Sequence, residues 1–266
     1  MLRDVLRKTL YDQRRSYPAW CLGVLLLVAM YVALWPSIKG QPSMRDFLAQ
    51  MPEAFRNLFA MAGADMSTPV GYIQIELLSF MGPLLVLLYA VGAGSSSVAG
   101  EEDRRTLDLL LTTPVTRSRV VVDKALAMVA GTLGLATLLG LALVAEGAPV
   151  GMDLPAGNVA AAMLHLALLG LVFGALSLAI GAGTGRLGLS RAIPVFVAVL
   201  AYVVNGLGGL VDWLTPMQKL SPFYQYAAHD PLRNGVSWSA VGVAVATVVA
   251  LVLVAVAGFD RRDITS

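Results

Sequence analysis

The stretch GEEDRRTLDLLLTTPVTRSRVVVDKALAMVAGTLGLATLLGLALVA, residues 100–145, joins two unlike kinds of sequence. From Ala125 to Ala145 it holds no Asp, Glu, Lys or Arg, and a run of roughly 20 apolar residues is what an α-helix needs to cross a bilayer. The first part instead carries acids and bases close together. The stretch therefore predicts a membrane-spanning helix that is preceded by a polar insert outside the lipid.

The rest of the chain has the same apolar character. Of its 266 residues 57% are hydrophobic and only 14% are charged, whereas about a quarter are charged in a soluble domain. Backbone groups in lipid must be hydrogen bonded within the chain, and the apolar runs are longer than barrel strands of about ten residues. We therefore predict an all-α integral membrane protein that forms a single transmembrane domain over residues 1–266. The net charge of +2 suggests no nucleic-acid partner, and the single cysteine, Cys21, excludes an intrachain disulfide.

Six apolar runs are long enough to span a bilayer. The predicted spans cover residues of about 18–36, 77–99, 125–145, 158–183, 192–211 and 239–258. None of these windows contains an ionisable Asp, Glu, Lys or Arg, in keeping with a cost of roughly 3 kcal/mol for each charge at mid-bilayer. The segment 212–237 contains Trp213, Phe223 and Tyr226, and we interpret it as an interfacial cap with aromatic anchors.

Lysine and arginine are distributed unevenly between the two sides of these spans. Fourteen of the nineteen lie in the N-terminal segment, in the loops after the second and fourth spans, or in the C-terminal tail. Short loops rich in Lys and Arg stay in the cytoplasm. We therefore predict that both termini are cytoplasmic.

The N-terminal segment, residues 1–16, has an amphipathic pattern. Leu2, Val5, Leu6 and Leu10 recur at helical spacing, and basic residues fill the other positions. Such a stripe is typical of a helix that lies in the lipid headgroup layer. We therefore predict an interfacial helix before the first span.

The polar insert, residues 100–117, also carries a helical pattern. Apolar residues recur in it at positions i, i+3, i+4 and i+7, namely Leu107, Leu110, Leu111 and Pro114. This spacing predicts one apolar face of a helix. Acids at its start complement the helix dipole, and Pro114 would end the helix. We expect a short helix parallel to the membrane. The pattern alone leaves open whether it packs on its own bundle or binds a soluble partner.

The run Glu101-Glu-Asp-Arg-Arg-Thr-Leu-Asp-Leu-Leu-Leu-Thr-Thr-Pro-Val-Thr-Arg117, with Lys124 after it, resembles the cytoplasmic loop of type-2 ABC exporter permeases. That family typically reads Glu-Glu, then Gly-Thr-Leu-Glu-Leu-Leu-Leu-Ser-x-Pro-Val-Ser-Arg, then a lysine that opens the third span. This chain departs at Arg105, where the family usually has glycine. Two shorter similarities are Leu220-Ser-Pro-Phe-Tyr224 and Phe259-Asp-Arg-Arg-Asp263.

The resemblance implies a permease subunit of a bacterial cytoplasmic membrane that pairs with a second identical or homologous permease and with two ABC ATPase subunits. The insert would be the coupling helix, and the N-terminal stripe would lie on the connecting helix. The ATPase-docking residues that the resemblance implies are Glu101, Glu102, Arg104, Thr106, Leu107, Leu110, Leu111, Pro114 and Arg117. ATP and Mg would be bound by the partner, and no cofactor is expected on this chain. The aliphatic spans favour an amphipathic or hydrophobic cargo such as a drug, lipid or secondary metabolite.

A phosphate-binding loop of the Walker type is excluded by the positions of the lysines on this chain. A phosphate-binding loop needs a Gly-Lys pair followed by Ser or Thr, and none of the four lysines follows a glycine. We therefore expect no enzymatic activity of the chain itself.

A secondary transporter or channel is one alternative. Ion-coupled carriers usually place carboxylates within their spans. Here Glu76 and Glu146 fall just outside the predicted windows, at the outer ends of the second and third spans.

An intramembrane protease of the CAAX type is the other alternative. Its Glu-Glu-x-x-x-Arg motif is matched by Glu101 and Glu102, but the arginine comes one residue early, at Arg105. Metal chemistry would also need histidines on facing helices, whereas His165 and His229 lie in a span and in an outer loop.

Overall fold

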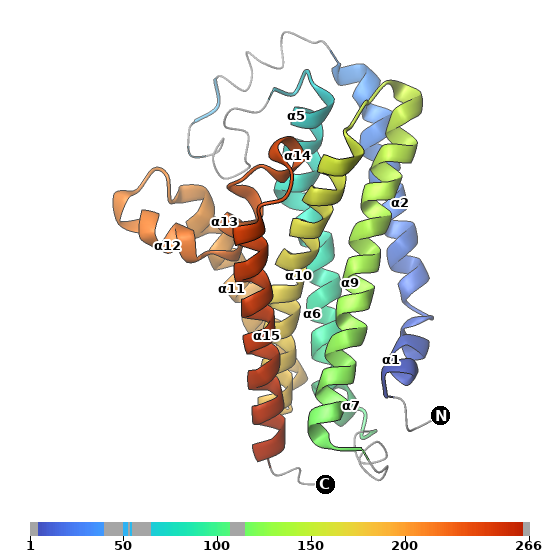
Figure 1. The fold of residues 1–266 in the computed structure, drawn as a ribbon, viewed down its shortest axis with the longest axis vertical. Coiled ribbons are helices and arrows are strands. Elements are labelled where there is room, and N and C mark those ends of the chain that lie inside the picture. Colours follow the sequence, from blue (N-terminus) through green and yellow to red (C-terminus); the bar gives the residue numbers. More distant parts are fainter. Residues whose placement is uncertain (1–4, 40–49, 53, 55–64, 107–114, 263–266) are drawn as a thin grey trace.

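The computed structural model describes residues 5–39, 50–52, 54, 65–106 and 115–262. Every element in this part of the chain is helical, and the long helices run side by side as an elongated bundle (Figure 1). The predicted docking residues Leu107, Leu110, Leu111 and Pro114, and Leu2 of the N-terminal stripe, lie outside the described residues.

Within the described ranges, six helices are long and apolar enough to cross a membrane. Their bounds are Tyr17–Ile38 (α2), Pro69–Ser97 (α5, Pro69–Ile73; η1, Gln74–Met81; α6, Gly82–Ser97), Arg117–Val150 (α9, Arg117–Gly147; η2, Ala148–Val150), Ala156–Thr184 (α10), Leu187–Leu207 (α11) and Trp238–Arg261 (α15). The predicted all-α membrane fold with six spans is therefore confirmed.

Two of the long helices begin about two turns before the spans predicted for them. The second span begins at Pro69 rather than near residue 77, because Pro69 fits the first turn and the Thr68 hydroxyl accepts a hydrogen bond from the Gly71 amide at 3.1 Å. The third span begins at Arg117 rather than near residue 125. Its first turns are charged, but the charges have partners, so the helix continues beyond the purely apolar window.

The second span contains a π-helical segment, η1, of eight residues. Such wider turns are rare and often occur at functional sites. Because the helix starts early, Glu76 lies inside this span and is half-buried. It therefore lies about two turns inside the helix, rather than at the outer end where the sequence placed it.

Helix α10 is the centre of the bundle, because 83% of the residues in its most apolar 18-residue stretch are buried. Small residues let its neighbours approach closely: a Cβ added at Gly94 of α6 would lie 2.3 Å from the Gly174 carbonyl oxygen of α10. Ser177 of α10 also donates a hydrogen bond to the Ser190 carbonyl oxygen of α11 at 2.7 Å. The core therefore lies around α10, and helices α2, α11 and α15 surround it with mostly exposed apolar faces.

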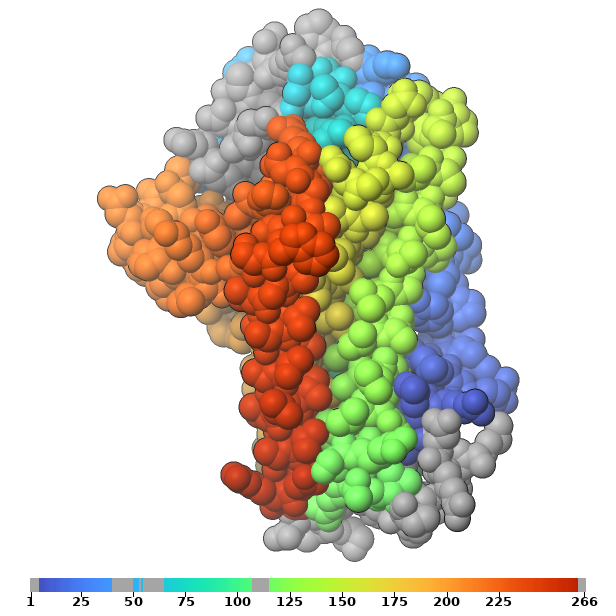
Figure 2. All heavy atoms as spheres, viewed as in Figure 1, coloured from blue at the N-terminus to red at the C-terminus, as the bar shows by residue number. Residues whose placement is uncertain are grey.

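One end of the bundle carries a cap of short helices, η3 (Asp212–Leu214), α12 (Thr215–Leu220), α13 (Pro222–Ala227) and α14 (Pro231–Asn234). Part of it stands out from the side of the bundle (Figure 2). Trp213 is 70% exposed, as an anchor would be, but Phe223 and Tyr226 are buried. The Tyr226 hydroxyl donates to the Leu78 carbonyl oxygen at 2.8 Å. These two aromatics therefore hold the cap onto the bundle, which corrects their interpretation as interfacial anchors.

Candidate functional site

The opposite end of the bundle, which we term the insert end, contains α1 (Val5–Gln13), α7 (Ala99–Asp103), the start of α9 and the end of α15. Both ends of the described chain lie here, next to the two flanks of the insert (Figure 1). These four pieces are far apart in sequence, so side-chain contacts between them determine how the insert is held.

The first flank of the insert is shorter than its pattern predicted. Helix α7 ends at Asp103, and Arg105 has a left-handed backbone with φ of 55°. The chain then turns back, so that the Thr106 amide donates to the Glu101 carbonyl oxygen at 2.8 Å. The predicted single helix from the acids to Pro114 was therefore wrong in its first part. Glycine, usual at the position of Arg105 in the similar permeases, adopts this backbone without strain.

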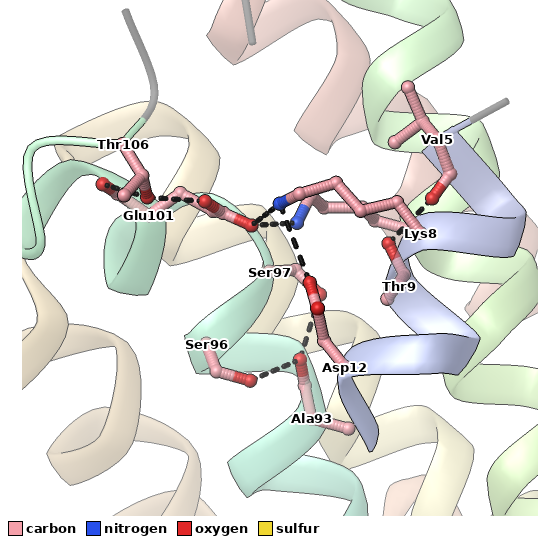
Figure 3. A network of polar contacts seen from close by, with 10 residues as sticks. Val5, Lys8, Thr9, Asp12, Ala93, Ser96, Ser97, Glu101 and Thr106 are labelled. Carbon is pink, nitrogen blue, oxygen red and sulfur yellow. Dashed lines mark hydrogen bonds and ion pairs between the residues drawn. The ribbon is translucent and has the colours of Figure 1, made fainter. Parts of the chain in front are cut away.

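Glu101 is the centre of a buried polar network (Figure 3). Its Oε1 accepts hydrogen bonds from the Lys124 Nζ at 2.8 Å and from the Lys8 Nζ at 3.1 Å. Its Oε2 accepts a hydrogen bond from the Thr106 hydroxyl. Glu101 is 8% exposed and Lys124 only 3%. One carboxylate thus joins α7 to α9 and to the N-terminal helix α1.

The charges of this network stabilise one another. Burial would raise the pKa of Glu101, but the charge and hydrogen bond of Lys124, together with Thr106 and Lys8, outweigh it and lower the pKa to about 2. Burial would lower the pKa of Lys8, yet Glu101 and Asp12 raise it. Asp12 lies 3.4 Å from the Lys8 Nζ. Near neutral pH, therefore, Glu101 is ionised and Lys8 is protonated.

A second set of contacts fastens the insert end to the C-terminal helix. The Glu102 carboxylate pairs with the Arg262 guanidinium. On the other flank, the Arg117 Nη1 donates to the Arg262 carbonyl oxygen at 2.7 Å and to the Phe259 carbonyl oxygen at 3.3 Å. Both flanks of the insert are thus connected to the end of α15.

The predicted site residues fall into three groups. Glu101 is enclosed, and Glu102 and Arg117 are half-buried against α15, whereas Arg104 is exposed. The docking role of these residues stays a prediction, and the leucines that would form the docking face lie outside the described residues.

The N-terminal segment forms a helix, α1, in which the residues of the predicted stripe differ in exposure. Val5 is 1% exposed and packs with Val120 of α9. Leu6 is half-buried and Leu10 is 41% exposed. The described part of the stripe is thus divided between packing on the bundle and exposure.

Sequence reasoning missed the roles of Lys8 and Lys124 as partners of Glu101. One signal was available: a lysine just before an apolar run is buried at low cost only beside a carboxylate. Five acids precede Lys124 within the insert and the start of the third span: Glu101, Glu102, Asp103, Asp108 and Asp123. The fold was needed to choose among them.

The charged side chains of the insert end form ion pairs with one another. Within the described ranges, no group of three or more His, Cys, Asp or Glu residues could hold a metal ion. Glu101 and Glu102 face lysine and arginine partners. These contacts hold the helices of the insert end together.

Comparison with protein families finds a match to a transporter family. The family model described as ABC-2 family transporter protein matches residues 3–264, nearly the whole chain. A comparison with curated proteins finds no match. This match agrees with a six-span helical bundle whose polar insert lies between the second and third spans. The chain therefore belongs to the ABC-2 family of transporter proteins, as a multi-pass transmembrane permease.

Proposed function

We propose that this protein is the permease subunit of an ATP-driven exporter in a bacterial cytoplasmic membrane. Its family implies partnership with ABC ATPase subunits. In this proposal two ATPases dock at the insert end, which faces the cytoplasm, and the permease works with a second identical or homologous copy. The excess of Lys and Arg at this end supports the orientation.

The observation that carries the proposal is the fastening of both flanks of the insert. A force on the insert would reach α9 through the Glu101–Lys124 pair and α1 through Lys8. It would reach α15 through the pairing of Glu102 with Arg262. The insert and these three helices would therefore move together, as a coupling element requires.

Within this proposal the residues at the insert end have different roles. Glu101 is enclosed and acts as a positioning residue that fixes the insert on the bundle. Direct contact with the ATPase falls to the apolar positions Leu107, Leu110 and Leu111, which the sequence places on one helical face. Arg104 is exposed and precedes Leu107, the first of these positions, by three residues.

The nature of the exposed surface supports an amphipathic or hydrophobic cargo. Helices α11 and α15 expose large apolar side chains along their length, among them Phe196 at 68% and Leu253 at 63%. A pathway between two copies of the permease would be lined by such faces. Drugs, lipids and secondary metabolites are cargoes of matching chemistry.

A single substitution in the insert tests the docking. Leu110→Arg places a charge on the apolar face, so the coexpressed ATPase should no longer copurify with the permease; Leu111→Arg should behave in the same way. Thr112→Arg is the matched control, since by helical spacing it lies on the opposite face and should leave copurification unchanged. Normal recovery of the ATPase with Leu110→Arg would contradict the proposal.

A further inference from the structure

Helices α6 and α11 border a groove on the side of the bundle. It contains a cavity of about 180 Å³ whose walls are almost entirely apolar. Its rim is formed by exposed residues of both helices, among them Leu84, Leu88, Val195 and Val199. Phe80 and Tyr202 meet edge to face across it, with ring centroids 5.9 Å apart. An apolar chain or ring system fits such a lining.

Helical spacing extends this groove toward the insert end. On α6, Gly92 and Ser95 lie about one and two turns beyond Leu88 on the same face. A Cβ added at Gly92 would meet no heavy atom within 4 Å. On α11, Arg191 lies one turn before Val195. The cavity lining itself ends at Leu88 and Val195; beyond it there is open space beside Gly92, and one further turn along α6 Ser95 is bonded to Arg191.

Arg191 and Ser95 form a polar end to this apolar groove. The Arg191 Nε donates to the Ser95 Oγ at 3.3 Å, and the Ser95 hydroxyl donates to the Gly92 carbonyl oxygen at 3.1 Å. Ser95 is fully buried, whereas Arg191 is exposed. This bond holds the guanidinium at the mouth of the groove.

The charge of Arg191 is not balanced by an acid in the described part of the chain. There, an acidic side chain lies within 4 Å of each of the basic residues Lys8, Arg119, Lys124, Arg233 and Arg262. No such pair involves Arg191. Its two terminal nitrogens are therefore available to an anion, and a guanidinium binds carboxylate or phosphate through two parallel hydrogen bonds.

We propose that the groove between α6 and α11 binds an anionic amphiphile. The apolar body occupies the cavity lined by Leu84, Val195 and Val199, next to the Phe80–Tyr202 ring pair, and the carboxylate or phosphate head pairs with Arg191. An amphiphile with this charge matches an apolar groove that ends in a single cation. We take this molecule to be an anionic phospholipid of the membrane, because the groove opens among exposed apolar residues on the side of the bundle.

That this molecule is the cargo rests on the proposed function. That it binds in the groove does not, because binding needs no ATPase. We would therefore use the full-length permease alone, in phosphatidylcholine nanodiscs. The probe is 11-(dansylamino)undecanoic acid, and its methyl ester has the same chain without the charge. Binding of each is followed by dansyl fluorescence.

The wild-type protein should bind the acid about tenfold more tightly than the ester, which is the order expected of a charge-assisted hydrogen bond. Arg191→Gln should abolish this preference and leave the affinity for the ester unchanged. Arg186→Gln is the matched control: Arg186 precedes α11, is exposed and has no acidic partner among the described residues, so the variant should keep the preference. The proposal would be overturned if Arg191→Gln kept the wild-type preference for the acid over the ester. It would also be overturned if Arg191→Gln and Arg186→Gln lost this preference equally.

A second pair of variants tests the cavity. Val199→Trp fills the groove and should weaken the binding of acid and ester alike, whereas Val249→Trp, on the similarly exposed face of α15, should not. If Val199→Trp left both affinities intact and instead changed the oligomeric state measured by light scattering, a second copy would occupy the groove and the proposal would be wrong.

The source of the amphiphile is distinguished by adding phosphatidylglycerol to the nanodiscs. Displacement of the acid in the wild type, but no effect of this lipid on Arg191→Gln, supports a phospholipid occupant. Undiminished binding of the acid would overturn the phospholipid as occupant and point instead to a carboxylate from the cell. A failure of ATPase copurification would leave all of these binding results unaffected, so the two proposals fail separately.

Discussion

The Lys124 amine is buried inside the bundle and lies 2.8 Å from the Glu101 carboxylate. Removing one member of a buried ion pair leaves the other uncompensated and typically costs about 3–5 kcal/mol. We expect Glu101→Gln to lower the Tm of the detergent-solubilised protein by several degrees. Glu102→Gln, at a half-buried pair, should lower it less. Equal shifts would mean that Lys124 is not held by Glu101.

An apolar replacement of the same pair should behave differently. Exchanging both members of a buried ion pair for apolar residues of similar size is often neutral. The double variant Glu101→Leu with Lys124→Met should therefore recover much of the Tm lost in Glu101→Gln. It should still lack the link from α7 to Lys8, so coupled ATP hydrolysis should stay impaired.

The pH dependence of stability follows from the same carboxylate. The pKa of Glu101 is about 2 in the folded protein against an ordinary value of 4.5. Its stabilising contribution is therefore complete above about pH 4.5 and is lost as the pH falls from there toward 2. The difference in Tm between the wild type and Glu101→Gln should shrink over this window. A difference that stays constant down to pH 3 would contradict this assignment.

At the scale of elements, the contact between α6 and α10 depends on glycine. A Cβ at Gly94 would lie 2.3 Å from the Gly174 carbonyl oxygen, whereas one at Gly92 would meet open space. Gly94→Ala should therefore force the helices apart and cost roughly 1–3 kcal/mol. Gly92→Ala should be neutral or stabilise by up to about 1 kcal/mol, because alanine favours the helix. Thermal unfolding of the two variants checks this, and similar Tm values would disprove the close packing.

The elements themselves could largely be predicted from the sequence. Long uncharged runs identify spans, since lipid tolerates few charges. The helix starts at Pro69 and Arg117 could not be predicted. The first depends on a cap at Thr68, and the second on charges that find partners only in the folded bundle. The network at Glu101 was missed for the same reason: its members come from three segments, and their pairing is a property of packing. Arg105 gave a partial signal, since a left-handed turn lies where the similar permeases have glycine.

At the scale of the whole molecule, the predicted orientation can be tested directly. In a variant whose Cys21 is replaced by serine, a single cysteine at Thr113 should react with a membrane-impermeant maleimide only from the cytoplasmic side. One at Ser67 should react only from the outside, because it precedes the second span at the other end of the bundle. Reversed labelling would overturn the orientation and, with it, the approach of the ATPases to the insert.

The first and last described segments meet at the insert end. Lys8 and Arg262 bind the adjacent residues Glu101 and Glu102, so the first and last described helices finish close to each other. Two copies could therefore be joined head to tail in one polypeptide by a short hydrophilic tether that never enters lipid. Such a genetic fusion would fix the stoichiometry at two and allow a substitution to be placed in one half only.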